Sequence, residues 1–155
     1  MIAAVAAETD SRLLLSNSIE VSVTWKEDDQ NPQNINGLWT VEPQEVTVKS
    51  TVALLKYTLS RDSTPGVQFT TGQGKEAPPV LWIFPSSPKN FDVTVVEKDG
   101  KPAQQLIIAD ANLTSAGEEP FHFRLVAVYN NVVRISPDPT IINVDPTQQV
   151  SRAAS

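Results

Sequence analysis

The alternation of apolar and polar residues constrains the fold of this chain more than any other feature. In IEVSVTW (19–25), every second residue is apolar and the residues between them are polar. An extended strand points successive side chains to opposite faces, so this pattern predicts a strand with one buried face. We interpret further segments as strands, and these are ALLKYTL (53–59), FDVTV (91–95), QQLIIAD (104–110), FHFRLVAVY (121–129), VVRIS (132–136) and TIINV (140–144).

The stretches between these segments are rich in turn-forming residues. Gly, Pro, Asn, Asp and Ser gather in KEDDQNPQNING (26–37), SRDSTPG (60–66), TTGQGKEAPP (70–79) and PSSPKN (85–90), and Asp99-Gly100 is a tight-hairpin signal. No segment carries an amphipathic helical stripe of useful length. The sequence therefore predicts an all-β fold, an antiparallel β-sandwich of about eight or nine strands, with TIINV as its last edge strand.

The length of the chain, 155 residues, fits one domain with a single core. We predict a single β-sandwich domain over residues 17–146, because no repeat or break in composition divides this range. Residues 1–16 and 147–155 are predicted to be flexible ends.

The charge and the amino-acid composition exclude several classes of function. The net charge is −6 and no cluster of Lys and Arg is present, which argues against nucleic acid and anionic membranes as partners. No apolar run approaches the length of a membrane span. No cysteine is present, so disulfides, thiolate metal sites and cysteine nucleophiles are excluded. MIAAVAAETD (1–10) has no Lys or Arg and only a short run of small residues, so we expect an unprocessed, cytoplasmic protein.

Three patterns that resemble functional motifs are better explained by ordinary structure. The single histidine, His122, has no cysteine or second histidine for a zinc site, and no GxSxG motif accompanies it. KEDD (26–29) lacks the spacing of an EF-hand loop, and TTGQGK (70–75) lacks the spacing of a phosphate-binding loop. We therefore predict no cofactor and no metal site.

Acid–proline pairs recur in the chain, at Glu42-Pro43, Glu119-Pro120, Asp138-Pro139 and Asp145-Pro146. One interpretation is structural: each proline begins or ends a strand and each acid caps a turn. The other interpretation is chemical. Two carboxyls held close together cannot both ionise, so one pKa rises and the pair can serve as acid and base on a water molecule. An aspartyl side chain can also attack its own carbonyl when a proline nitrogen is the leaving group, so self-cleavage at Asp-Pro fits the same residues.

The segments EEPFHFRLVAVY (118–129) and SPDPTIINVDP (136–146) resemble the DP-EP family of small bacterial proteins, named for its Asp-Pro and Glu-Pro dipeptides. The resemblance implies an immunoglobulin-like β-sandwich and an aspartic-peptidase activity with self-processing. Carried onto this sequence, Glu119-Pro120 is the Glu-Pro, and either Asp138-Pro139 or Asp145-Pro146 is the Asp-Pro. The D-[TS]-G triplet of pepsin-like and retroviral aspartic peptidases is absent, so the carboxyls would have to be arranged differently.

Two hypotheses of function follow. In the first, the protein is an acid-dependent peptidase or self-cleaving hydrolase that uses two catalytic carboxyls among Glu119, Asp138 and Asp145 on a peptide or protein substrate. In the second, it is a noncatalytic β-sandwich module that binds a ligand or a protein through loops or by strand addition at a sheet edge. An exposed edge strand would also allow homo-oligomers to form. The hypotheses differ in whether two of these carboxyls meet in a partly buried site.

Overall fold

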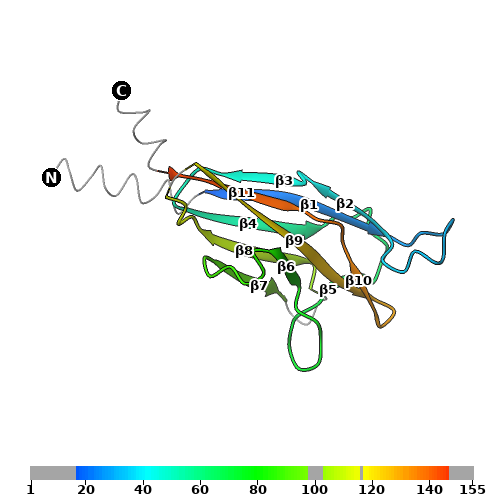
Figure 1. Ribbon diagram of the computed structural model, residues 1–155. Helices are drawn as coiled ribbons and strands as arrows, with labels where there is room; N and C mark the ends of the chain where they lie inside the picture. Colours follow the sequence, from blue (N-terminus) through cyan, green and yellow to red (C-terminus); the bar gives the residue numbers. More distant parts are fainter. Residues whose placement is uncertain (1–16, 98–102, 116, 147–155) are drawn as a thin grey trace.

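A computed structural model describes residues 17–97, 103–115 and 117–146 of the chain. In these residues the chain forms eleven strands in two sheets, so the predicted all-β sandwich is confirmed (Figure 1). The predicted flexible ends, 1–16 and 147–155, lie outside the described residues. The strands are β1 (Ser18–Lys26), β2 (Leu38–Glu42), β3 (Glu45–Val48), β4 (Val52–Leu59), β5 (Gln68–Phe69), β6 (Val80–Phe84), β7 (Phe91–Val96), β8 (Gln105–Ala111), β9 (Glu118–Tyr129), β10 (Val132–Ile135) and β11 (Thr140–Val144).

Both sheets contain a parallel pair, which the expected antiparallel sandwich did not include. The first sheet has the order β2-β1-β4-β8-β7, and the second has the order β10-β9-β11-β3, with β5 and β6 also paired to β9. Strands β1 and β4 run parallel, as do β11 and β3, while the other pairs are antiparallel. Strand β11 therefore lies between β9 and β3, and the expectation that it is an edge strand was wrong. Its second neighbour is β3, a segment in which the sequence pattern did not indicate a strand.

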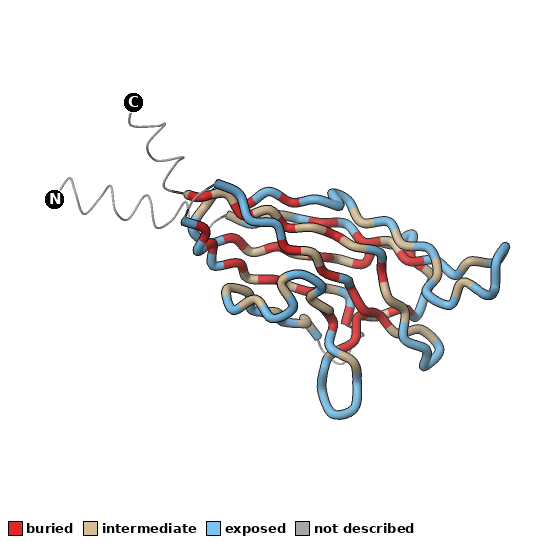
Figure 2. Tube along the Cα trace, viewed as in Figure 1, coloured by how far each residue is buried: buried red, intermediate tan, exposed pale blue. Residues whose placement is uncertain are grey.

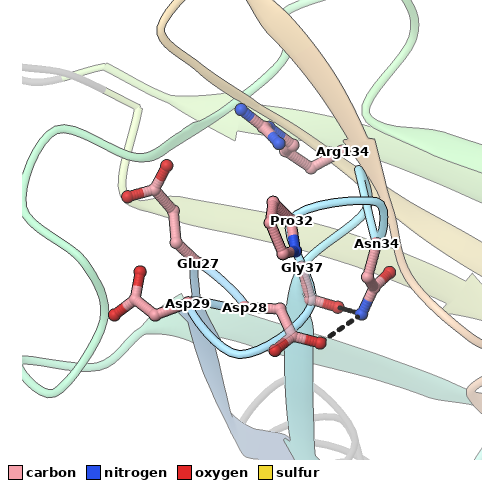
Figure 3. Close-up of a pocket in the computed structure, with 7 residues that line it drawn as sticks. All are labelled: Glu27, Asp28, Asp29, Pro32, Asn34, Gly37 and Arg134. Carbon is pink, nitrogen blue, oxygen red and sulfur yellow. Dashed lines mark hydrogen bonds between the residues drawn. The ribbon is translucent and has the colours of Figure 1, made fainter.

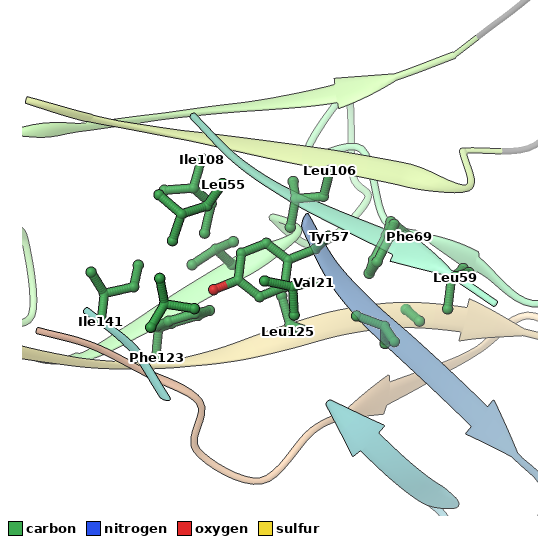
Figure 4. Close-up of a cluster of buried hydrophobic side chains, with 14 of the residues drawn as sticks. Val21, Leu55, Tyr57, Leu59, Phe69, Leu106, Ile108, Phe123, Leu125 and Ile141 are labelled. Carbon is green, nitrogen blue, oxygen red and sulfur yellow. The ribbon is translucent and has the colours of Figure 1, made fainter. Parts of the chain in front are cut away.

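Alternate side chains of both sheets form the hydrophobic core (Figure 4). In β1, Val21, Val23 and Trp25 are buried, as the alternation predicted. Strands β4 and β9 contribute in the same way, with Ala53, Leu55, Tyr57, Leu59, Phe121, Phe123, Leu125 and Ala127. Figure 2 shows that buried positions recur along the strands, whereas the loops between them are mostly exposed.

The strands that the sequence did not predict are β2, β3, β5 and β6, which is why the count exceeds eight or nine. Strand β5 has two residues and β3 has four, too few to establish a period of two. The predicted hairpin turn at Asp99-Gly100 lies outside the described residues. The strands on either side of it, β7 and β8, do pair antiparallel.

Tyr57 is fully buried, and its hydroxyl has no hydrogen-bond partner among the described residues. It lies among apolar side chains such as Leu125 and Val21 (Figure 4), and burial raises its pKa. An unpaired buried hydroxyl carries a desolvation penalty, so we expect Tyr57→Phe to raise the free energy of unfolding by about 1 kcal/mol. Urea denaturation would measure this, with Tyr129→Phe at a half-buried tyrosine as the control that changes little. A loss of stability in Tyr57→Phe would contradict the expectation.

Candidate functional site

The three predicted carboxyls lie at two different ends of strand β11. Asp138 precedes the strand and Asp145 follows it, and a rise of about 3.3 Å per residue separates them by roughly 20 Å. Glu119 lies in β9, directly opposite Asn143 of β11. The main-chain N–H of Asp145 donates to the carbonyl oxygen of Gly117 at 3.0 Å. The structure therefore brings Glu119 and Asp145 to the same end of the sandwich and places Asp138 at the other.

Asp138 takes part in an ion pair on the surface. Its Oδ1 lies 3.2 Å from Nη2 of Arg124, and both side chains are 44% exposed. Arg124 also donates from Nη1 to the carbonyl oxygen of Ser136 at 3.3 Å. Exposed pairs of this kind contribute less than about 1 kcal/mol. The contact orients the loop before β11, and the partner of Asp138 in it is a cation rather than a second carboxyl.

A further carboxyl, Asp110, is fully buried at the end of β11 where Asp145 lies. It belongs to β8 and has the same strand phase as the buried Leu106 and Ile108, so its side chain points between the sheets. Its Oδ1 accepts hydrogen bonds from Nδ2 of Asn143 at 2.9 Å and from Nδ2 of Asn90 at 3.3 Å. We define the acid–amide cluster as Asp110, Asn90, Asn143, Glu119 and Asp145.

The surroundings of Asp110 favour its neutral form. Burial raises the pKa of Asp110 from 3.8 to about 6, the hydrogen bonds from Asn143 and Asn90 oppose this rise, and the negative charge of Glu119 adds to it. Asp110 therefore exchanges its proton at a pH where an ordinary aspartate is already ionised. Perturbed carboxyls of this kind are frequent at functional sites.

The peptide group before Asp145 is held at both of its polar atoms. Nδ2 of Asn112 donates to the carbonyl oxygen of Val144 at 2.7 Å, and the N–H of Asp145 donates to Gly117. Asn112 is itself fixed, because its Oδ1 accepts from the N–H of Thr114 at 3.2 Å. The Asp145 side chain is only 3% exposed. The main chain is thus immobilised directly before the Asp145-Pro146 bond.

Two cavities lie away from the acid–amide cluster. One, of about 220 Å³, lies beside the turn after β1, between Asp29 and Arg134 (Figure 3). In its wall, Oδ2 of Asp28 accepts from Nδ2 of Asn34 at 3.1 Å, so the acidic stretch 26–29 is part of a structured loop. The other, of about 590 Å³, lies beside β5 and the turn at 130–131. Neither cavity is lined by a residue of the cluster.

Two kinds of feature are missing from the described part of the chain. No group of three or more His, Cys, Asp or Glu side chains there could hold a metal ion. No helix in that part is long and apolar enough to cross a membrane.

The sequence reasoning missed Asp110 and Asn143, although a signal for both is present. In QQLIIAD, Asp110 occupies the inward phase that Leu106 and Ile108 define. In TIINV, Asn143 likewise follows the buried Ile141. A polar residue in the buried phase of a strand needs a hydrogen-bond partner, so each of these two residues could have been recognised as requiring one, although the sequence does not show that they bind each other.

Comparison with models of known protein families finds a match over most of the chain. A model of the DP-EP family matches residues 17–145, a range that spans all of the described strands. The match includes Glu119-Pro120 and Asp138-Pro139, and its last residue is Asp145. A search of curated proteins found no match.

Proposed function

The chain belongs to the DP-EP family, and we propose that it is a self-processing protein of aspartic-peptidase type that cleaves its own chain between Asp145 and Pro146. The observation that carries the proposal is the immobilised Asp145, whose preceding peptide group is bound by Asn112 and Gly117. Its side chain is buried at the end of the sandwich where Glu119 also lies. The immunoglobulin-like topology and the bacterial origin implied by the family resemblance stay predictions.

The proposed reaction needs only groups at this end of the sandwich. A carboxylate oxygen of Asp145 attacks the main-chain carbonyl carbon of the same residue, and the bond to the Pro146 nitrogen breaks. The leaving nitrogen takes a proton from Glu119 in those molecules in which this carboxyl is protonated, so the step is acid-dependent. Water then opens the cyclic anhydride at residue 145 to two carboxyls and returns a proton to Glu119. The products are residues 1–145 and the peptide 146–155.

The burial of Asp110 and Asp145 favours cleavage of the chain's own bond over cleavage of an added substrate, whereas Glu119 is exposed. Asp110 is 0% exposed and Asp145 is 3% exposed. The two cavities described above lie elsewhere, so neither delivers a foreign peptide to these carboxyls. An intramolecular attack requires no such access, because the reacting atoms already lie in one residue.

Intact mass spectrometry after incubation between pH 3.5 and 7 tests the proposal. We expect fragments 1–145 and 146–155 from the folded protein. They should be absent in Asp145→Ala and should form about a hundredfold more slowly in Glu119→Gln, since a general acid typically contributes that much. Asp138→Ala is the matched control, because Asp138-Pro139 is the same dipeptide outside the cluster and its loss should not change cleavage at 145.

The chain also supplies a control for simple acid lability. In urea, unfolded protein should break at both Asp-Pro bonds to a similar extent, whereas the folded protein should break only after Asp145. Equal cleavage at the two bonds in the folded protein, or an unchanged mass at every pH, would rule out self-processing.

The second candidate function is a noncatalytic interaction module. It is supported by strand β6, which among the described strands pairs only with β9 and which exposes Ile83 (40%) and Phe84 (66%). A protein strand could add to this edge, either from another protein or from a second copy of the chain. An unchanged mass in the experiment above would favour this candidate.

A further inference from the structure

Two buried oxygen atoms in the acid–amide cluster have no hydrogen-bond donor among the described residues, namely Oδ2 of Asp110 and Oδ1 of Asn143. Both residues are 0% exposed, and the bond from Nδ2 of Asn143 to Oδ1 of Asp110, 2.9 Å long, already joins them. Buried acceptors without a donor are unfavourable. A proton on Asp110 would correct this, because a protonated carboxyl is a donor.

We propose that Asp110 is a positioning residue for cleavage after Asp145 and that it acts through Asn143. The proton on Oδ2 of Asp110 is donated to Oδ1 of Asn143, so that the carboxyl and the amide form a closed pair of hydrogen bonds. Rotation about the last side-chain torsions, which are soft in Asp and Asn, brings the two oxygens together. The inference rests on the proposed self-cleavage and adds the residue that controls it.

The closed pair connects the two sheets at the end where cleavage is proposed. Asp110 belongs to β8 of the first sheet and Asn143 to β11 of the second (Figure 1). Asn143 and Asp145 are two residues apart and lie on the same side of the chain, as residues with the same strand phase do. Fixing the Asn143 side chain therefore fixes the strand end from which Asp145 extends. Without the closed pair, that strand end loses a contact to the other sheet.

The groups that face Asp110 make the pair sensitive to pH. Its register partners, Ala53 of β4 and Phe91 of β7, carry no charge. The charged neighbour is Glu119 of β9, and Asp145 follows β11 on the same side. An ionised Asp110 would therefore meet further negative charge, and the two oxygens would again lack a donor. The pair is closed in acid and opens as the pH rises.

The expected size of this response follows from the proton uptake. The pKa of Asp110 is about 6 in the closed state, and an opened Asp110 returns toward 3.8. Since the opened state binds fewer protons between these values, the equilibrium constant for opening should increase about tenfold from pH 5 to pH 7.5.

Hydrogen exchange of the main-chain amides tests the closed pair independently of cleavage. The measurement uses the full chain with Pro146→Ala, which replaces the labile Asp-Pro bond by an ordinary Asp-Ala bond. The protection of the Asp145 amide should fall about tenfold from pH 5 to pH 7.5, after correction for intrinsic exchange. In Asp110→Asn, whose amide can donate permanently to Asn143, protection should stay constant. In Asp110→Ala it should be low at both pH values.

Each contrary outcome has a separate meaning. Constant protection with Asp110 intact, or an equal fall in Asp110→Asn, would overturn the closed pair. With Pro146 restored, Asp110→Asn should retain cleavage, and Asp110→Ala should be cleaved at least about tenfold more slowly. Cleavage of Asp110→Ala at the wild-type rate would overturn only the positioning role of Asp110. If exchange follows the expected pattern but no variant cleaves, the proposed self-processing is overturned and so is the role of Asp110 in it.

Discussion

Asp110→Asn should raise the free energy of unfolding at pH 7 by about 2 kcal/mol and leave it nearly unchanged at pH 4. The folded-state pKa of Asp110 is about 6, above its ordinary value of 3.8. Between these values the folded protein holds a proton that the unfolded chain has released. The contribution of Asp110 is therefore fully present below pH 3.8 and is lost as the pH rises through about 6. Asparagine keeps the shape of the carboxyl but cannot ionise, so the variant avoids this loss.

Urea denaturation at several values between pH 4 and pH 7 would measure the difference between wild type and Asp110→Asn. Other groups titrate in the same range, and subtracting the two curves removes their effect. Asp92→Asn is the matched control, since Asp92 is exposed on the neighbouring strand β7 and loses the same charge. Parallel curves for wild type and Asp110→Asn would show that folding does not change the pKa of Asp110 and would contradict the prediction.

Trp25→Ala should lower the free energy of unfolding by about 4 kcal/mol, the usual effect of truncating a buried aromatic residue. Trp25 is 0% exposed in β1, and its ring centroid lies 5.1 Å from that of Tyr129. The guanidinium carbon of Arg134 lies 5.3 Å from the Trp25 ring. A Cβ placed on Gly37 would come within 2.5 Å of Nε1 of Trp25, which shows how closely the chain encloses the indole. Truncation would leave a cavity that these neighbours cannot fill.

Trp39→Ala provides a matched control for that measurement. Both indoles donate to the carbonyl oxygen of Asn36, Trp25 at 2.8 Å and Trp39 at 2.9 Å. Trp39 is only half-buried in β2. Its truncation should remove an equivalent hydrogen bond but lower the free energy of unfolding by less than about 2 kcal/mol. The difference between the two variants isolates the contribution of burial. Equal losses would indicate that the shared hydrogen bond, rather than packing, holds this region.

The sequence predicted the long strands well because burial on one side requires alternation. The segments 19–25, 53–59 and 121–129 all became strands with the expected face inward, and 104–110 was correctly predicted as a strand, apart from its first residue. The parallel pairs could not be predicted in this way. Alternation says which face of a strand is buried, but it does not identify the neighbour along the strand edge, and β3 and β11 are far apart in the sequence.

The candidate site was predicted only in part, for a related reason. Among the acid–proline pairs, the sequence could not show that Glu119 and Asp145 share an end of the sandwich while Asp138 does not, because that depends on the register of β9 against β11. No sequence motif marks Asp110 as a functional residue. Its properties arise from burial against Asn143 of the opposite sheet, a contact that only the assembled fold creates.

The pairing of β3 with β11 also sets an order of events during biosynthesis. A ribosome makes β3 early, but its strand neighbour is the last strand described. Contacts between such distant segments form slowly, since a long loop must close first. The nascent chain therefore holds the unsatisfied edge of β3 until β11 emerges. The bond proposed to be cut comes directly after β11, so a cleaved C-terminus would identify molecules whose second sheet had already been assembled.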